Sequence, residues 1–455
     1  MTTETTAKTV TLEMLYGAPR WHEVRWRGLM DAAHPAWQCA FRPFFVLTVL
    51  AAIALMLLWV AFLTLGLPLP LGAASGPFAW HAHELLLGMG GAAAAGFAMT
   101  AAAEFTETPE YTAQPQQRLV VLWLAARLAF WCSGFALPLL LLSGMLQLAF
   151  LGYLAALLWP RFWGDAGRRH MSFIWSLALL MLGCAGFYVQ AARGAYAVPW
   201  LHGLLAAFLV LIVVALSRIS MSMVNAALED IDARDDEGEP LHYLARPPRR
   251  NLAMLCIGLW GAAQALEWPG SVGGWLALAA SAAVFNLMGD WHVGRALLRR
   301  WALLLYGCYA LMAAGFALIG LAKLGWLAAP QTAGVHLLTA GSFSLIIFTV
   351  MVIAGYTHSG LKRDRRPWVL WAAGGIVTAA VLRVLAYWVA PLLLQGISGL
   401  LWAASFAAMA WHMLPVWLAG RVDGRWGGHG VLDEFTDDAL RLAAQAAQGK
   451  GAGAS

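Results

Sequence analysis

Residues 43–67 read PFFVLTVLAAIALMLLWVAFLTLGL, an apolar run without a charged side chain. A helix of about 20 apolar residues crosses the hydrocarbon core of a bilayer, which is roughly 30 Å thick. Helices suit this environment because each one satisfies its own backbone hydrogen bonds. Comparable runs lie near residues 78–103, 118–137, 143–160, 172–192, 198–217, 251–268, 272–291, 301–322, 333–356, 367–389 and 396–419. The sequence therefore predicts an all-α integral membrane protein with twelve transmembrane helices, in which a weak break around residues 133–138 separates the third from the fourth.

Composition and charge support the same class. Apolar residues make up 61% of the 455 residues and charged residues only 12%, a balance that soluble domains do not show. If the amino terminus is inside, all lysines and arginines except Arg127, Arg193, Lys323 and Arg383 fall in cytoplasmic segments or termini, in agreement with the positive-inside rule. We therefore expect a multi-pass protein of the bacterial inner membrane with both termini cytoplasmic. The net charge of +5 is a topology signal, and no nucleic-acid partner is expected.

The polar ends of the chain flank one long apolar region. Residues 1–40 mix charges with tryptophans and are interpreted as an amphipathic cytoplasmic lead-in at the lipid headgroups. Residues 41–420 form the twelve-helix transmembrane domain, and residues 421–455 form a cytoplasmic tail. Five cysteines are scattered without a Cys-x-x-Cys-His motif, which excludes covalent c-type haem and a zinc ribbon.

Polar side chains inside the predicted spans are the candidates for chemistry, because they are costly in a bilayer. His81, His83 and Glu84 lie early in the second span, His202 early in the sixth and His336 early in the tenth. These spans run in the same direction, so the four histidines are predicted to share one layer near the periplasmic face. Arg383 reaches the same layer, and Arg127 lies nearer the middle of its helix.

Neutral imidazoles in an apolar surrounding are ligands for haem iron or copper. Arginines at the same depth would bind haem propionates, although Glu84 could instead form a structural ion pair with one of them. At 100° per residue, His81 and His83 point about 200° apart while His81 and Glu84 share a face. A b-type haem held by His83 and His336, which share a His-x4-Gly spacing, is therefore favoured.

The remaining polar groups allow further sites. His81 and Glu84, with His202, are candidates for copper or for supporting a ligand. On the cytoplasmic side, His292, His358 and His412 could form a second site, but loop-proximal groups that contact water or lipid phosphates are the simpler interpretation.

Several motifs resemble the NnrS family from about residue 40 to 425. They are FRPFF (41–45), WHAHELLLG (80–88), GFAMTA (96–101) and HLLTAGSFSLIIFTVMVIAGYTHSG (336–360). The resemblance implies a twelve-helix bacterial membrane protein with haem and copper, linked to nitric oxide and nitrosative stress. The chain departs from the family pattern at residues 104–108 (EFTET), and at Tyr306, which stands where relatives often have a histidine.

Two hypotheses follow. The first is a haem-binding redox protein, with copper as a second candidate metal, that handles nitric oxide or protects against it. As an enzyme it would be a membrane oxidoreductase acting on nitric oxide, with a quinol or another redox partner as a candidate electron donor. The second is a transporter or a metal or cofactor assembly factor that uses the same histidines. By analogy alone, haem–copper oxidases also carry histidine ligands on their second, sixth and tenth helices.

Overall fold

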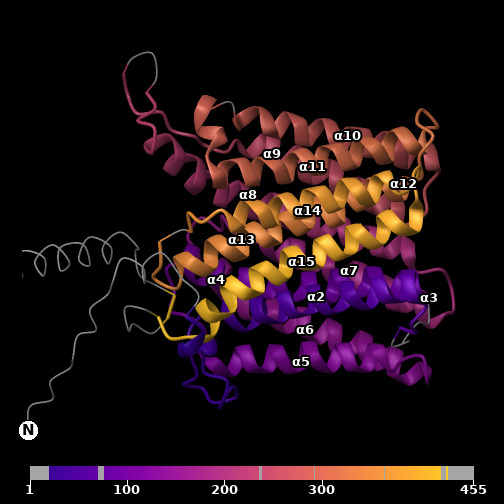
Figure 1. Ribbon diagram of the computed structural model, residues 1–455, viewed down its shortest axis with the longest axis horizontal. Helices are drawn as coiled ribbons and strands as arrows, with labels where there is room; N and C mark the ends of the chain where they lie inside the picture. The colour runs from indigo at the N-terminus through magenta and orange to yellow at the C-terminus, as the bar shows by residue number, and fades with distance from the viewer. Residues whose placement is uncertain are drawn as a thin grey trace, which may run out of the picture.

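The structure, a computed structural model, describes residues 20–69, 76–234, 238–291, 293–362, 364–421 and 427–428. In this part of the chain twelve long helical segments run side by side (Figure 1), and no strand is present beyond one isolated bridge. The segments are α2 (Phe41–Leu65), α3, η3 and α4 (Gly76–His83, Glu84–Gly90 and Gly91–Phe105), α5 (Ala113–Trp131), α6 (Leu137–Gly164), α7 (Met171–Ala192), α8 (Val198–Glu229), α9 (Pro247–Ala265), α10 (Gly270–Met288), α11 (Arg300–Lys323), α12, η6 and α13 (Gln331–His336, Leu337–Phe343 and Ser344–Thr357), α14 (Trp368–Leu385) and α15 (Pro391–Leu418).

Ten of these twelve segments are long and apolar enough to cross a membrane, counted over the described residues. The other two, α5 and α9, each contain two arginines. They nevertheless pack along their neighbours, α5 on α6 and α9 on α8 and α10. The prediction of an all-helical multi-pass membrane protein is confirmed.

Helix boundaries agree with the apolar runs except at a few ends. The weak break between the third and fourth spans is real, since α5 ends at Trp131 and α6 begins at Leu137. By contrast, α8 continues to Glu229, well past the predicted end at residue 217. Its extension is held by packing, because Val224 and Leu228 are buried. Arg218 and Asn225 therefore lie on α8.

The twelve segments form three groups of four. In each group the second segment is the most enclosed: 89%, 83% and 78% of the residues in the most apolar windows of α3–α4, α8 and α12–α13 are buried, against 33% to 56% in the other seven candidate spans. The last segment of each group packs on the first of the next, namely α6 on α7, α10 on α11 and α15 on α2. These three contacts join the groups into a closed ring, and the three most enclosed segments are those that carry the predicted histidines.

The two ends of the bundle differ in their side chains. We call the end where α3, α8 and α12 begin the histidine end, and the opposite end, where α2 begins and α15 finishes, the arginine end (Figure 1). Residues 20–40 of the lead-in pack at the arginine end, where the indole of Trp37 donates to the carbonyl of Leu29 and Gln116 of α5 donates to the carbonyl of Trp37.

Two of the three most enclosed segments contain a π-helix directly after a histidine. Residues Glu84–Gly90 follow His83, and residues Leu337–Phe343 follow His336. The two π-helices meet at their far ends, where a Cβ on Gly90 would lie only 2.5 Å from Cζ of Phe343. The His-x4-Gly spacing of the sequence thus falls in the same local structure on both helices. π-Helical turns are rare and are frequently found at functional sites.

Candidate functional site

His83 lies at the centre of a buried polar network at the histidine end. Its Nδ1 is 2.9 Å from Oε1 of Glu84, and its Nε2 is 2.9 Å from the hydroxyl of Tyr188 on α7. The ring stacks on Phe130 with a centroid distance of 3.7 Å. Because a carboxylate only accepts, Nδ1 donates to Glu84, and in the neutral ring Nε2 accepts from Tyr188. Both ring nitrogens of His83 are therefore engaged.

Glu84 links this histidine to α5. Its Oε1 forms an ion pair of 3.1 Å with Nη1 of Arg127, and its Oε2 accepts from the indole of Trp131 at 2.8 Å. Arg127 also donates to the side-chain oxygen of Gln147 on α6. Glu84 is 1% exposed, so its charge is matched inside the bundle. A buried carboxylate needs such a matching cation and donors to remain ionised.

The carboxylate of Glu84 contacts the ring of the neighbouring His83, a partner that the sequence did not single out. One prediction about this network is corrected. Arg127 is not near the middle of its helix, because α5 ends at Trp131 and the arginine is level with Glu84.

His81, His336 and Arg383 form a second cluster at the same end. His81 lies close enough to His336 and Arg383 for electrostatic interaction with both. Its ring stacks on Trp59 of α2 with a centroid distance of 4.2 Å. Nδ1 of His336 lies 2.7 Å from the carbonyl oxygen of Thr332, one turn earlier. Three helices, α3, α12 and α14, thus bring two imidazoles and one guanidinium together.

This second cluster contains polar atoms without partners. Among the described residues, Nδ1 of His81 and Nη1 of Arg383 are buried and form no hydrogen bond. The guanidinium of Arg383 lies over the ring of Tyr387 at 4.8 Å. Buried polar atoms are normally hydrogen-bonded, so the arrangement fits a group that is bound there.

His202 has a third set of neighbours. Its ring lies 6.4 Å from that of Trp260 on α9, and the charge of Lys323 on α11 acts on it. The four predicted histidines therefore start from one end of the bundle but are divided among three surroundings. No group of three or more His, Cys, Asp or Glu side chains with metal-binding geometry occurs in the described part of the chain.

The histidines at the arginine end have separate partners. Nε2 of His358 lies 3.5 Å from a carboxylate oxygen of Glu104, while the ring of His412 stacks on Trp368 with a centroid distance of 4.4 Å. His292 lies outside the described residues, as does the tail beyond residue 428. No common site of these histidines can be described.

The sequence did not single out Tyr188, Gln147, Trp131 and Ser143, which complete the network around His83. The hydroxyl of Tyr188 lies 2.7 Å from Oγ of Ser143. Gly144, beside that serine, allows the tyrosine to approach, since a Cβ there would lie 2.9 Å from Cγ of Tyr188. Tyrosine, serine and tryptophan are common in membrane helices, so their types alone carry no signal.

The fold and this end of the bundle define a multi-pass membrane protein with polar clusters on its most enclosed helices. A family model described as NnrS protein matches residues 35–421. The chain belongs to the NnrS family, which is linked to the nitric oxide response. No curated protein matches it.

Proposed function

We propose that this chain is a haem-binding protein of the bacterial inner membrane that acts in nitric oxide metabolism or in protection against nitrosative stress. The observation that carries the proposal is the cluster of His81, His336 and Arg383. It combines two imidazoles from different helices with a cation, and it leaves buried polar atoms without partners.

The atoms of the cluster suit a haem. Nδ1 of His336 is held by the carbonyl of Thr332, an arrangement that fixes the tautomer and leaves Nε2 free to bind a metal. His81 offers the second imidazole from another helix, and Arg383 offers a cation for a propionate. When bound, a haem would supply an iron centre that binds nitric oxide and carries an electron.

Haem fits this cluster better than copper. A haem needs only two protein ligands, because the macrocycle supplies the other four nitrogens. Protein copper sites usually need a third ligand, and in the described residues no third His, Cys, Asp or Glu completes such a group. Copper at these histidines therefore stays the second choice.

His83 has a different role in this proposal. Its ring is fixed between Glu84 and Tyr188, so it positions the start of the π-helix and does not bind the iron. The proposed ligand pair is therefore His81 and His336, whereas the sequence favoured His83 and His336. Arg127, which neutralises Glu84, belongs to the same supporting network.

The proposed orientation places the histidine end at the periplasm. Arginines and lysines gather in the segments of the other end, so both termini and the loop after α8 would be cytoplasmic. The haem would then lie near the periplasmic face.

Replacement of the proposed ligands tests the function. In purified protein, a pyridine haemochrome assay and metal analysis should show haem b, and His81→Ala and His336→Ala should each abolish it. His83→Ala should retain haem, and so should His412→Ala at the other end. All variants should remain in the membrane at the level of the unmodified protein.

Two outcomes would contradict the proposal. Full haem content in both His81→Ala and His336→Ala would show that these histidines are not the haem ligands. Loss of haem in His83→Ala alone would favour the pair predicted from the sequence, His83 and His336. Purified protein without any haem or copper would instead favour a transporter or an assembly factor.

A further inference from the structure

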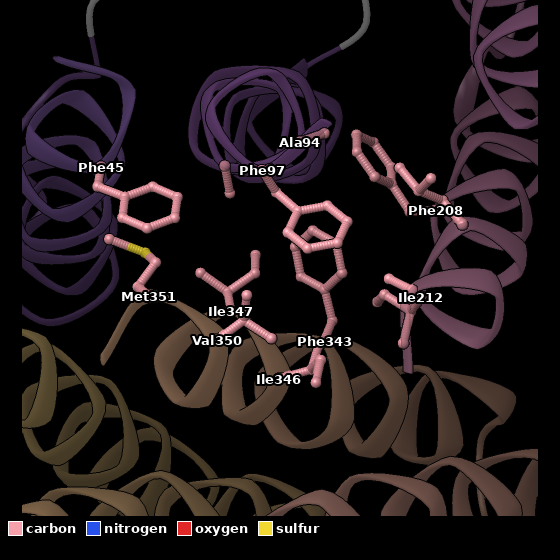
Figure 2. A pocket seen from close by; sticks show the side chains of 14 residues that line it. Phe45, Ala94, Phe97, Phe208, Ile212, Phe343, Ile346, Ile347, Val350 and Met351 are labelled. Carbon is pink, nitrogen blue, oxygen red and sulfur yellow. The ribbon is translucent and has the colours of Figure 1, made fainter. Parts of the chain in front are cut away.

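An apolar chamber lies inside the bundle, away from the histidine clusters. It is lined by α2, α4, α8 and η6–α13 and contains about 490 Å³ of empty space, part of which is open to the outside. Figure 2 shows Phe45, Phe97, Phe208, Ile212 and Phe343 pointing into it from these helices. Every lining residue is apolar. Such a chamber does not hold ordered water well but readily accepts an apolar group.

A second, more polar chamber adjoins it on the side of the arginine end. This vestibule has an empty volume of about 730 Å³, part of it open to solvent, and shares Phe45, Phe97 and Val350 with the inner chamber. Its charged lining residues are Glu104, Arg218 and His358. Phe41 and Phe105 add aromatic rings to its wall. The two chambers together match an amphiphile with a polar ring and an apolar substituent.

Glu104 and His358 form the polar wall of the vestibule. Nε2 of His358 lies 3.5 Å from Oε2 of Glu104, and Nδ1 lies 3.3 Å from the carbonyl oxygen of Gly428. The carboxylate side chain is 54% exposed, so it can reach a ligand. Because Nδ1 of His358 donates to the carbonyl of Gly428, the neutral ring presents Nε2 as an acceptor. Both side chains of this wall therefore accept hydrogen bonds, as from the hydroxyl of a ligand.

The charge of the vestibule favours an uncharged head group. One carboxylate, Glu104, and one guanidinium, Arg218, belong to the same lining. Nη2 of Arg218 points to the carbonyl oxygen of Arg169 at 3.5 Å, so its charge is partly turned to the protein surface. An anionic head would gain from the arginine and lose against the carboxylate. A neutral ring that donates and accepts hydrogen bonds suits both groups.

We propose that the two chambers bind a quinol, whose hydroxyls can donate to Glu104 and His358. The oxygen-bearing ring lies in the vestibule against Glu104 and His358 and between the aromatic side chains, and the first part of the apolar substituent enters the inner chamber. This site is separate from the histidine end, and binding there does not depend on the haem proposed above. It gives the protein a membrane-soluble redox partner of defined chemistry.

Binding of two quinols to purified protein tests the site. The probes are the tritiated reduced form of a decyl-substituted dimethoxy-methyl-benzoquinone and the same reduced ring without the decyl chain, measured by scintillation proximity under anoxic, reducing conditions. Glu104→Leu and His358→Phe should weaken binding of both probes about tenfold, as expected for the loss of one hydrogen bond. Ala94→Leu on α4 and Ala215→Leu on α8 fill the inner chamber and should weaken only the decyl form.

Ala282 is exposed on α10, so Ala282→Leu is the matched control and should bind both probes normally. Unchanged thermal unfolding of each variant shows that it has folded. Equal affinity of all folded variants for the decyl probe would overturn the proposal. The proposal would also be overturned if an organic extract of the protein contained an acidic phospholipid in place of a quinone or quinol, and if Arg218→Gln removed that lipid.

Discussion

The ion pair between Arg127 and Glu84 gives the sharpest test of the buried network. We consider Arg127→Met, which keeps the length of the side chain and removes its charge. The carboxylate of Glu84, 1% exposed, would then remain in the bundle without a cation. It would still accept from Nδ1 of His83 and from the indole of Trp131.

The expected loss follows from these contacts. Removing one partner of a buried ion pair destabilises a protein by about 3–5 kcal/mol, because the other charge stays uncompensated. Since two hydrogen bonds to Glu84 persist, we expect about 3 kcal/mol, the lower end of that range. Adding Glu84→Gln to Arg127→Met removes the stranded charge, so the double variant should recover most of the loss.

Reversible unfolding in mixed micelles measures this free energy for the single and double variants. Arg193 is exposed just after α7, and Arg193→Met is the control for loss of a positive charge, with less than about 0.5 kcal/mol expected. If the unfolding free energy of Arg127→Met lies within about 1 kcal/mol of that of the unmodified protein, the network does not hold an ionised carboxylate. A double variant less stable than Arg127→Met would also refute the reasoning.

Three further predictions concern packing, pH and orientation. Gly144→Ala should lower the free energy of unfolding by about 1–3 kcal/mol, because the new Cβ would lie 2.9 Å from Cγ of Tyr188. Gly152→Ala is the control and should have little effect, because its Cβ would lie 3.7 Å from the nearest atom. Equal unfolding free energies of the two variants would contradict this prediction. Burial raises the pKa of Asp364 in the loop before α14, but hydrogen bonds from Arg366 outweigh it and hold the pKa below its usual value. The ionised Asp364 therefore contributes fully to stability above about pH 4, and this contribution is lost as the pH falls through the lowered pKa. The unfolding free energy of Asp364→Asn should depend less on pH in the acid range. An unchanged acid profile would argue against the ion pair. Alkaline phosphatase fused to the carboxyl terminus should be inactive, and activity there would reverse the proposed orientation.

The helices could be predicted from the sequence because lipid imposes a simple rule. Each span needs an apolar run of fixed length, and even the short break between α5 and α6 was visible. The rule fails where a helix leaves the membrane: α8 continues to Glu229, because side chains such as Val224 pack there although the run has ended.

The partners of the histidines could not be predicted in the same way. The rotation of a side chain depends on every turn before it, and the change to a π-helix at Glu84 is not visible in residue types. Tyr188 reaches His83 from another helix, 105 residues later in the chain, so no local pattern connects them. The layer and the residue types were accessible from the sequence, while the pairing of His83 with Glu84 and of His81 with His336 required the fold.

Closure of the ring has a consequence for the order of synthesis. The guanidinium of Arg42, at the start of α2, donates to the carbonyl of Ala419 at 2.7 Å, just beyond the end of α15. It also donates to the carbonyl of Trp417 at 3.5 Å, within α15. A ribosome makes α2 first and α15 last, so the flank of α2 that α15 covers has no such cover until nearly the whole protein has been translated. Contacts so distant along the chain form late. A nascent protein that stalls before residue 391 would thus present an open seam in the lipid, with a normally buried arginine at one end of it.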